Sequence, residues 1–309
     1  MAALEFHSFC FPAMGTNCQL QLYAPSTHAA EHAARVSIQE IRRIEFRFSR
    51  YRPDSDLSQL NLIAKAGGSL QVDGETAGLL NYAFAAYRRS GGLFDVTSGL
   101  LRRAWDFKSG RLPEQRTLDE LIPRVGLDKV YWNEPQLSFS QPGMELDFGG
   151  IAKEYAADRA AIVCMAAGVE HGLVDLGGDI RVTGPHPDGQ PWQIGIRHPR
   201  RNGEWLATAL LHRGALATSG DYERCIQANG RRFGHILHPG TGWPVQGLCS
   251  VSVMAEQCLL AGTVCTTAML KGDRGPDWLA SLNLPYLWMD EHGACGEHSW
   301  PASAHRVAA

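Results

Sequence analysis

The feature that most constrains this chain is a succession of short strand-like segments in its second half, with no helical pattern between them. Strands are predicted at residues 172–176, 180–184, 192–197, 205–211, 215–219, 234–237 and 247–254. The Gly177-Gly178 pair between the first two segments fits a tight hairpin turn. Consecutive strands combined with separate helices favour an α+β fold with mostly antiparallel sheets over a doubly wound parallel fold.

Helical periodicity marks five other segments. The clearest lies at residues 28–48, where apolar residues recur at spacings of three and four. Weaker patterns predict helices at 56–63, 76–90, 151–167 and 257–271. No repeat, low-complexity stretch or linker divides the sequence. We therefore predict one domain over residues 1–309, in which helices flank the sheets and two subdomains interlock.

Composition excludes several classes of protein. Hydrophobic residues make up 44% and charged residues 20%, which is ordinary for a globular enzyme. A formal net charge of −3 argues against a nucleic-acid-binding protein. No run of about 18 apolar residues occurs, so no membrane span is predicted. Paired arginines such as Arg102-Arg103 are interpreted as solvated surface.

The cysteines and the first residues bear on the compartment. None of the eight cysteines forms a CxxC motif or a zinc-like spacing, so buried free thiols in a reducing compartment are expected. Residues 1–14 contain no Lys or Arg and no long apolar stretch, unlike a secretory signal. We therefore expect a cytoplasmic protein.

The segment Asp147-Phe-Gly-Gly-Ile-Ala-Lys153 places two glycines at a predicted strand-to-helix junction. Backbone N–H groups at such a turn can approach an anion closely, and a nearby lysine adds positive charge. The spacing matches neither a Walker A loop nor GxGxxG. The alternative is a tight turn that needs glycine for its backbone conformation.

Three further segments carry candidate chemistry. His235-Ile-Leu-His238 precedes a Pro-Gly turn and could supply an acid or a base, or be purely structural. A strand there would place the two histidines on opposite faces, which argues against a shared metal. Residues 217–222 could offer hydroxyls to a phosphate, or form a polar loop. Leu93-Phe94-Asp95 could border a ligand, or cap the next segment.

Taken together, these motifs occur in a distinctive order. The series is Met14-Gly-Thr, Ser49-x-Tyr51-x-x-x-Ser55, Gly92-x-Phe94-Asp95-x-Thr97, Asp147-x-Gly-Gly-Ile-Ala-Lys153-x-Tyr155, Asp175-Leu-Gly-Gly-Asp, Ala217-Thr-Ser-Gly-Asp-Tyr222, His235-Ile-Leu-x-Pro239 and Thr266-Thr-Ala-Met-Leu-Lys-Gly272. Over nearly the whole chain, with motifs within residues 9–275, this resembles the ApbE family of FAD:protein FMN transferases.

The resemblance implies roles for individual residues. Those expected to contact FAD are Met14, Tyr51, Leu93, Phe94, Asp95, Asp147, Lys153 and Ile236. A magnesium ion would lie between the Asp147 junction and the last helix, bound by the Gly150 carbonyl and the Thr266 hydroxyl. An acceptor flavoprotein would be the partner: its Thr or Ser hydroxyl would attack the FMN-side phosphorus, AMP would leave, and His235 would act as general base.

The sequence departs from the family pattern at three positions. Gly262 stands where the family usually has a metal-binding Asp, Glu154 replaces a Gly, and His238 stands where Asp is common. Three alternatives for the metal stay open: it is held by Thr266, backbone and FAD phosphates; Asp147 assists; or no metal is bound. Two alternative functions also stay open, namely an FAD pyrophosphatase and a flavin-binding protein without turnover.

Overall fold

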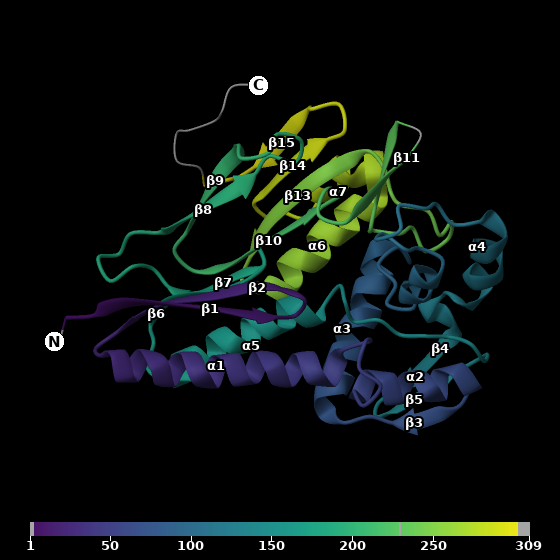
Figure 1. Cartoon of the computed structure of the whole chain (residues 1–309), viewed down its shortest axis with the longest axis horizontal. Coiled ribbons are helices and arrows are strands. Elements are labelled where there is room, and N and C mark those ends of the chain that lie inside the picture. The colour runs from purple at the N-terminus through teal and green to yellow at the C-terminus, as the bar shows by residue number, and fades with distance from the viewer. Residues whose placement is uncertain (1–2, 229, 302–309) are drawn as a thin grey trace.

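The computed structural model describes residues 3–228 and 230–301 and is built around one large antiparallel sheet (Figure 1). The strand order in this sheet is β1-β2-β6-β7-β10-β13-β14-β15, and every pair in it is antiparallel. The strands are β1 (Glu5–Ala13), β2 (Thr16–Ala24), β6 (His171–Leu176), β7 (Ile180–Gly184), β10 (Gly214–Gly220), β13 (Leu248–Ala255), β14 (Tyr286–Asp290) and β15 (Cys295–His298). Two hairpin pairs lie outside it: β8 (Trp192–Arg197) with β9 (Trp205–Leu211), and β11 (Cys225–Ala228) with β12 (Arg231–Gly234).

Three helices pack around this sheet: α1 (Thr27–Phe48), α5 (Ala152–Ala166) and α6 (Cys258–Lys271). Helix α1 begins at Ser26, whose hydroxyl accepts a hydrogen bond from the Ala29 N–H and so satisfies one free donor of the first turn. Helix α1 packs against α5 and against β1 and β2, helix α5 lies against β6 and β7, and α6 lies against β10 and β13 (Figure 1). Helices α5 and α6 also contact each other.

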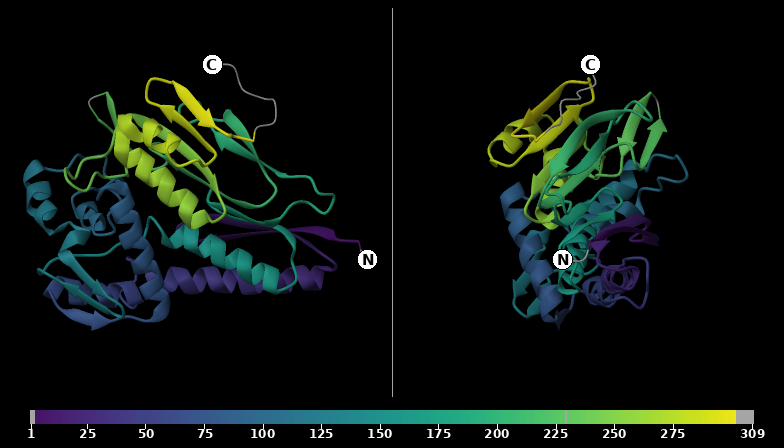
Figure 2. Two further views of the ribbon diagram at one scale, coloured as in Figure 1. Left: turned by 180° about the vertical axis from the view of Figure 1, so that it is seen from behind. Right: turned by 90° about the vertical axis from the view of Figure 1, so that its left-hand side faces the viewer.

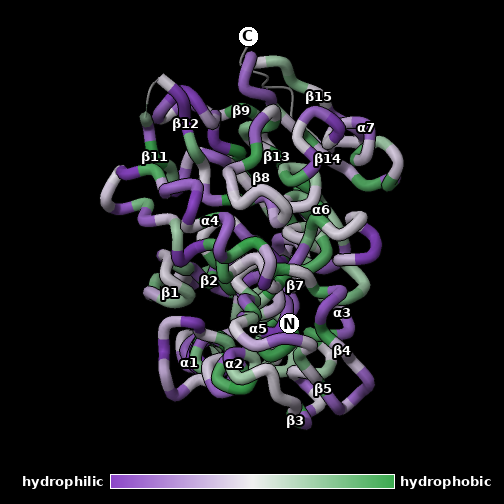
Figure 3. The backbone as a smooth tube through the Cα atoms, turned by 90° about the vertical axis from the view of Figure 1, so that its right-hand side faces the viewer, coloured by the Kyte–Doolittle hydropathy of each residue, from purple (hydrophilic) through white to green (hydrophobic). Residues whose placement is uncertain are grey.

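The remaining helices and a small sheet form the other end of the molecule, seen from two further directions in Figure 2. They are α2 (Asp56–Ala66), α3 (Gly74–Ser90), α4 (Gln115–Leu121), and the sheet of β3 (Ser69–Gln71), β5 (Gln136–Phe139) and β4 (Val130–Asn133). A short helix, α7 (Gly275–Ala280), follows α6. Hydrophobic segments concentrate on the inner elements and hydrophilic ones on the outer loops (Figure 3). Within the described residues, no helix is both long and apolar enough to span a bilayer.

The predicted α+β class with mostly antiparallel sheets is confirmed. The Gly177-Gly178 turn is confirmed too: both glycines have positive φ, 69° and 94°, and the Leu176 N–H donates to the Asp179 carbonyl at 2.9 Å. Residues 1–2, 229 and 302–309 of the predicted single domain lie outside the described residues.

One strand was predicted at the wrong place. Instead of 234–237, the strand is β12 (Arg231–Gly234), which pairs with β11, so His235 follows the strand. The chain turns next: the His238 carbonyl accepts from the Thr241 and Gly242 N–H groups at 3.3 and 2.8 Å. The argument that a strand would place the two histidines on opposite faces therefore does not apply.

Helix α5 was predicted to bury one face, but it buries more. Of the predicted face, Ala152, Ala156 and Ala160 are buried, but Tyr155 and Val163 are only partly buried. Glu154, Ala157, Ala161 and Cys164 are buried in addition. The cause is its central position, because α1 covers one side of α5 while α6 and β7 cover others. A buried Glu154 is the consequence that matters most for the site.

Candidate functional site

The glycine junction before α5 is organised by Asp147, which is 9% exposed. One oxygen, Oδ1, accepts a hydrogen bond of 2.8 Å from the Gly149 N–H. The other, Oδ2, accepts from Arg50 Nη1 at 2.6 Å and lies 3.7 Å from Arg102 Nε. A Cβ added at Gly99 would lie 2.2 Å from the Asp147 Cβ, so glycine is required there for close approach. The Asp147 carboxylate therefore fixes the junction rather than standing free.

Arginines surround this junction more closely than the sequence indicated. Arg50 also donates to Glu145 Oε1 at 3.0 Å, and Arg103 pairs with the other oxygen of Glu145 at 2.5 Å. The interpretation of Arg102-Arg103 as plain solvated surface is thus corrected, because both side chains face buried carboxylates. Two partly buried cations, Arg50 and Arg102, lie at the glycine turn, which suits an anionic ligand.

Lys153 lies in the first turn of α5 and points to the β6–β7 turn. Its ammonium donates to the Leu176 carbonyl at 3.1 Å and pairs with the Asp179 carboxylate. Burial lowers the pKa of Lys153, but the Asp179 and Glu154 carboxylates outweigh it and raise the pKa above its ordinary value. The lysine is therefore a fixed positive charge, held in place by the hairpin turn.

Glu154 follows Lys153 and points to α6. It is 7% exposed, and its Oε2 atom is buried without a hydrogen-bond partner. Burial and the neighbouring Asp179 carboxylate raise the pKa of Glu154 above its ordinary range. A Cβ added at Gly262 would lie 2.6 Å from the Glu154 Cγ and 2.8 Å from its Oε1. The Glu154 side chain therefore fills the space beside Gly262.

The two residues expected to bind a metal lie near this carboxylate in the fold. Thr266 lies one helical turn beyond Gly262, and its hydroxyl is 3.2 Å from that of Ser219 on β10. Gly150 precedes α5, and a Cβ added there would be 3.4 Å from the Phe94 ring. In the part of the chain that the structure describes, no three His, Cys, Asp or Glu side chains gather as a metal cluster. A metal here would need hydroxyl, backbone or substrate oxygens as well.

His235 is half-buried, and its Nδ1 atom has no hydrogen-bond partner. Burial first, and then the charges of Arg102 and Arg224, lower the pKa of His235 to about 4. Lys153 adds to the same effect, which shows that the histidine shares the electrostatic environment of the glycine junction. At neutral pH the imidazole is therefore uncharged.

The loop that contains Leu93, Phe94 and Asp95 is held by internal hydrogen bonds. Asp95 Oδ1 accepts from the N–H and hydroxyl of Thr97 at 2.7 and 2.6 Å, and Oδ2 accepts from the Leu127 N–H at 3.0 Å. Its carboxylate thus shapes the loop, and Phe94 packs near Gly150. Leu93 is partly buried against the main core.

The remaining expected FAD contacts are dispersed. Met14 forms the β1–β2 turn with Gly15, has a positive φ of 54°, and its N–H donates to Glu45 Oε1 at 2.6 Å. The Tyr51 ring is 78% exposed and lies 5.9 Å from the Arg50 guanidinium carbon. Ile236 packs between two core clusters. The structure therefore brings Asp147, Lys153, His235 and the metal candidates to one region, with Met14 and Tyr51 in flanking turns.

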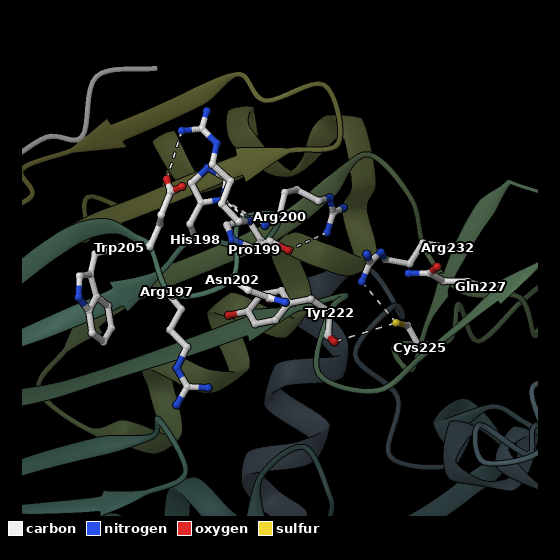
Figure 4. A pocket seen from close by; sticks show the side chains of 13 residues that line it. Arg197, His198, Pro199, Arg200, Asn202, Trp205, Tyr222, Cys225, Gln227 and Arg232 are labelled. Atoms are coloured by element: carbon white, nitrogen blue, oxygen red, sulfur yellow. Dashed lines mark hydrogen bonds and ion pairs between the residues drawn. The ribbon is translucent and has the colours of Figure 1, made fainter.

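A cavity of about 740 Å³ lies between the β8–β9 hairpin and β11 (Figure 4). Four arginines line it, at positions 197, 200, 201 and 232. Arg200 is held by two hydrogen bonds of 2.7 Å to Asp221, and Arg232 donates to the Cys225 sulfur at 3.4 Å. None of the residues expected to bind FAD lines this cavity. It therefore carries no part of the site assignment.

Sequence reasoning missed three site residues. Arg50 carried no motif signal, because a lone arginine in a polar loop is usually solvated. Asp179 stood inside a quoted motif but received no role, although a buried lysine needs a counter-charge. Glu154 was noted only as a departure from the family pattern. Its contact with Gly262 joins two positions 108 residues apart.

Comparison with known proteins agrees with this arrangement. Residues 14–288 match the model of the ApbE family. A protein of Haemophilus influenzae named FAD:protein FMN transferase is 31% identical over 244 residues, which cover 75% of this chain and 70% of that protein. The crystal structure of the ApbE protein of Thermotoga maritima superposes with a TM-score of 0.87 at 29% identity, over 96% of this chain and 97% of the other. The flavin transferase ApbE of Vibrio cholerae gives 0.85 at 27%, over 97% and 98%. Because the family model covers most of the sequence, and the glycine junction, the paired lysine and the neutral histidine lie in one region, the chain belongs to the ApbE family.

Proposed function

We propose that this protein transfers FMN from FAD to a Thr or Ser hydroxyl of an acceptor flavoprotein and releases AMP. The observation that carries the proposal is that His235, from a distant part of the chain, meets Asp147 and Lys153 of one motif at a glycine-lined junction. The naming of relatives as FAD:protein FMN transferases supports the same reaction.

In this reaction the acceptor oxygen forms a bond to the FMN-side phosphorus, and the bond from that phosphorus to the AMP oxygen breaks. The acceptor hydroxyl loses its proton to His235, and AMP leaves with the bridging oxygen. The low pKa of His235 in the free protein keeps the imidazole unprotonated, and the charge of a bound diphosphate would raise this pKa toward neutrality. His235 is thus suited to accept a proton only once FAD is bound.

The other residues position the dinucleotide. Lys153 and Arg102 supply positive charge for the diphosphate. Met14, Tyr51 and Ile236 would supply apolar surface for the flavin and adenine rings, and the backbone of residues 93–95 would contact FAD. Asp95 and Asp147 hold the two loops that present backbone N–H groups. Most of the rate acceleration would come from this positioning and charge, as is general for phosphoryl transfer.

Magnesium fits the site chemically, because a buried carboxylate oxygen with no partner lies beside α6. Gly150 and Thr266 would hold the ion together with phosphate oxygens, which suits its preference for hard oxygen ligands. When bound, magnesium would neutralise charge on the diphosphate. We place the protein in a reducing compartment such as the cytoplasm, since Cys18, Cys164, Cys249, Cys258 and Cys265 are buried thiols outside any disulfide.

One incubation tests the function. The protein is mixed with FAD, Mg²⁺ and a purified flavoprotein domain that accepts phosphoester-linked FMN, and the products are weighed by mass spectrometry. A covalent FMN adduct with equimolar AMP is the expected result. An acceptor whose target Thr or Ser is replaced by Ala is the control and should stay unmodified. Free FMN without adduct would indicate a pyrophosphatase, and unchanged FAD would indicate a flavin-binding protein without turnover.

A further inference from the structure

Two departures from the ApbE pattern meet in space. Glu154 on α5 and Gly262 on α6 lie 108 positions apart in the sequence. A Cβ at position 262 would be 2.6 Å from Glu154 Cγ, 2.8 Å from its Oε1 and 3.0 Å from its Cδ. Real Cβ atoms do not approach other atoms so closely, so these two positions cannot both carry a side chain in this packing. Glycine at 262 opens the space that Glu154 occupies.

The Glu154 carboxylate lacks a protein partner for one of its oxygens. Glu154 is 7% exposed, yet Oε2 makes no hydrogen bond. Leaving a buried acceptor of this kind unsatisfied is costly unless a ligand completes it. A ligand that satisfies a bare carboxylate oxygen must be a donor or a cation.

The local balance of charge favours a cation. Asp179 is 3% exposed, and its carboxylate pairs with the Lys153 ammonium. Burial and the Asp179 carboxylate raise the pKa of Glu154, so a cation bound there would displace a proton. With both carboxylates then ionised, Lys153, Glu154 and Asp179 together carry one excess negative charge. The next acid along α5, Asp158, is already engaged, because its two oxygens accept the Cys258 and Leu259 N–H groups and Arg181 lies 3.5 Å away. A divalent cation beside Glu154 would turn this excess into one positive charge, which the phosphates of a bound dinucleotide would balance.

Hard oxygen donors lie beside this carboxylate on the same face of α6. Thr266 follows Gly262 by four residues, so both positions face the same direction from the helix. The Thr266 hydroxyl is 3.2 Å from the Ser219 hydroxyl on β10, so two hydroxyl oxygens lie together on this side of α6. One carboxylate with hydroxyl and phosphate oxygens is the donor set that magnesium prefers.

We infer that Glu154 supplies the metal-binding carboxylate that the ApbE pattern places at position 262. The carboxylate reaches the metal from α5 instead of α6, and the Glu154 and Gly262 departures form one compensating pair. This inference rests on the proposed function for the identity of the metal. It removes the need to regard the protein as a weakened family member.

Metal binding tests the inference without reliance on turnover. Protein freed of metal by EDTA is titrated with Mn²⁺, alone and with FAD, and free Mn²⁺ is followed by EPR. Mn²⁺ serves as the probe because it shares the oxygen preference of Mg²⁺. The variants are Glu154→Gln, Glu154→Gly, Gly262→Asp and the double variant Glu154→Gly/Gly262→Asp. The matched control is Glu114→Gln, at an exposed position with no side-chain cap hydrogen bond.

We expect Mn²⁺ binding to require one carboxylate, either at position 154 or at position 262. Glu154→Gln and Glu154→Gly should each weaken Mn²⁺ binding at least about tenfold, since even indirect metal partners carry effects of this size. The double variant should return to within about threefold of wild type, because it moves the carboxylate back to α6. Gly262→Asp alone should lower the melting temperature, because the two side chains overlap. Glu114→Gln should bind as wild type does.

Three results would overturn the inference. They are wild-type Mn²⁺ affinity in folded Glu154→Gln, no recovery in the double variant when it melts as wild type does, and no Mn²⁺ binding by the wild type with or without FAD. Circular dichroism melting shows whether each variant is folded. Failure of the proposed function would look different: the wild type would bind Mn²⁺ through Glu154 but transfer no FMN to the acceptor domain.

Discussion

Arg50 and Asp147, 97 residues apart in the sequence, share a hydrogen bond of 2.6 Å between Arg50 Nη1 and Asp147 Oδ2. The same guanidinium reaches Glu145 Oε1 at 3.0 Å, so one cation serves two carboxylates that are each less than one-tenth exposed. This contact joins the loop after α1 to the junction before α5, where the structure has a loop instead of the predicted strand. The junction therefore depends on a residue far from its own motif.

Arg50→Ala should destabilise the protein because it leaves two buried carboxylates with less compensation. We expect the free energy of unfolding to fall by about 3 kcal/mol, measured by urea denaturation at pH 7. Arg116→Ala is the control, since its pair with Glu120 is exposed, and the change there should stay within about 0.5 kcal/mol. A loss for Arg50→Ala no larger than that of the control would contradict the structural role of Arg50.

The stability of the protein should depend on the titration of His235. Its folded pKa of about 4 lies below the ordinary value of 6.5, so folding favours the neutral ring. The contribution of the neutral His235 ring to the free energy of unfolding is complete above pH 6.5 and is lost as the pH falls toward 4. Between pH 7 and pH 4.5, the free energy of unfolding should fall by roughly 2 kcal/mol more in wild type than in His235→Asn.

Urea denaturation of both proteins at the two pH values measures this difference. NMR titration of the His235 ring should also give a pKa that rises when FAD is added. Parallel losses of stability in the two proteins would refute the assignment.

Asp158 connects the two helices of the site, because its carboxylate on α5 accepts the first two N–H groups of α6 at 2.8 and 2.9 Å. Asp158→Ala should cost about 1–2 kcal/mol of unfolding free energy, as the loss of an N-terminal cap does. Asp158→Asn keeps an acceptor oxygen and should cost less. Equal losses in the two variants, measured by chemical denaturation, would rule out capping as the cause.

Gly177 and Gly178 should respond differently to alanine. Both have positive φ, so both variants pay a backbone penalty of about 1–2 kcal/mol. Only Gly177→Ala also places its Cβ 2.4 Å from the Thr16 Oγ1, while a Cβ at Gly178 has open space. We expect a further loss of about 1–3 kcal/mol for Gly177→Ala in thermal or urea unfolding.

Adding Thr16→Ala should recover most of this further loss, because it removes the atoms that the new Cβ would strike. If the Gly177→Ala protein were as stable as Gly178→Ala, the β6–β7 turn would not pack against Thr16 of the β1–β2 turn as described.

Local patterns in the sequence predicted much of this fold. The apolar stripe at 28–48 is α1, and the paired glycines at 177–178 make the expected turn, because both features depend on neighbours in sequence. Strand β11 escaped prediction: Cys225–Ala228 is short and half polar, and only pairing with β12 makes it a strand. Local pattern cannot reveal a partner that lies beyond a turn.

The site was less predictable for the same reason. Asp147 and Lys153 stand in a recognisable motif, but Arg50 and Asp179, which hold them, were assigned no role. Glu154 and Gly262 each looked like a defect, since nothing in a linear sequence shows that α5 and α6 bring them into contact. The roles of the individual site residues and the single-domain organisation stay predictions until they are measured.

The bond between Asp158 and the start of α6 has a mechanical consequence. Sliding one helix along the other by a single residue, about 1.5 Å, would pull both N–H groups away from the carboxylate. The two helices must therefore move as one body, and any opening that admits the dinucleotide has to come from the turns around them. Loop replacements at Met14 or Tyr51 should thus alter entry and exit of ligand while the pair of helices α5 and α6 keeps its arrangement.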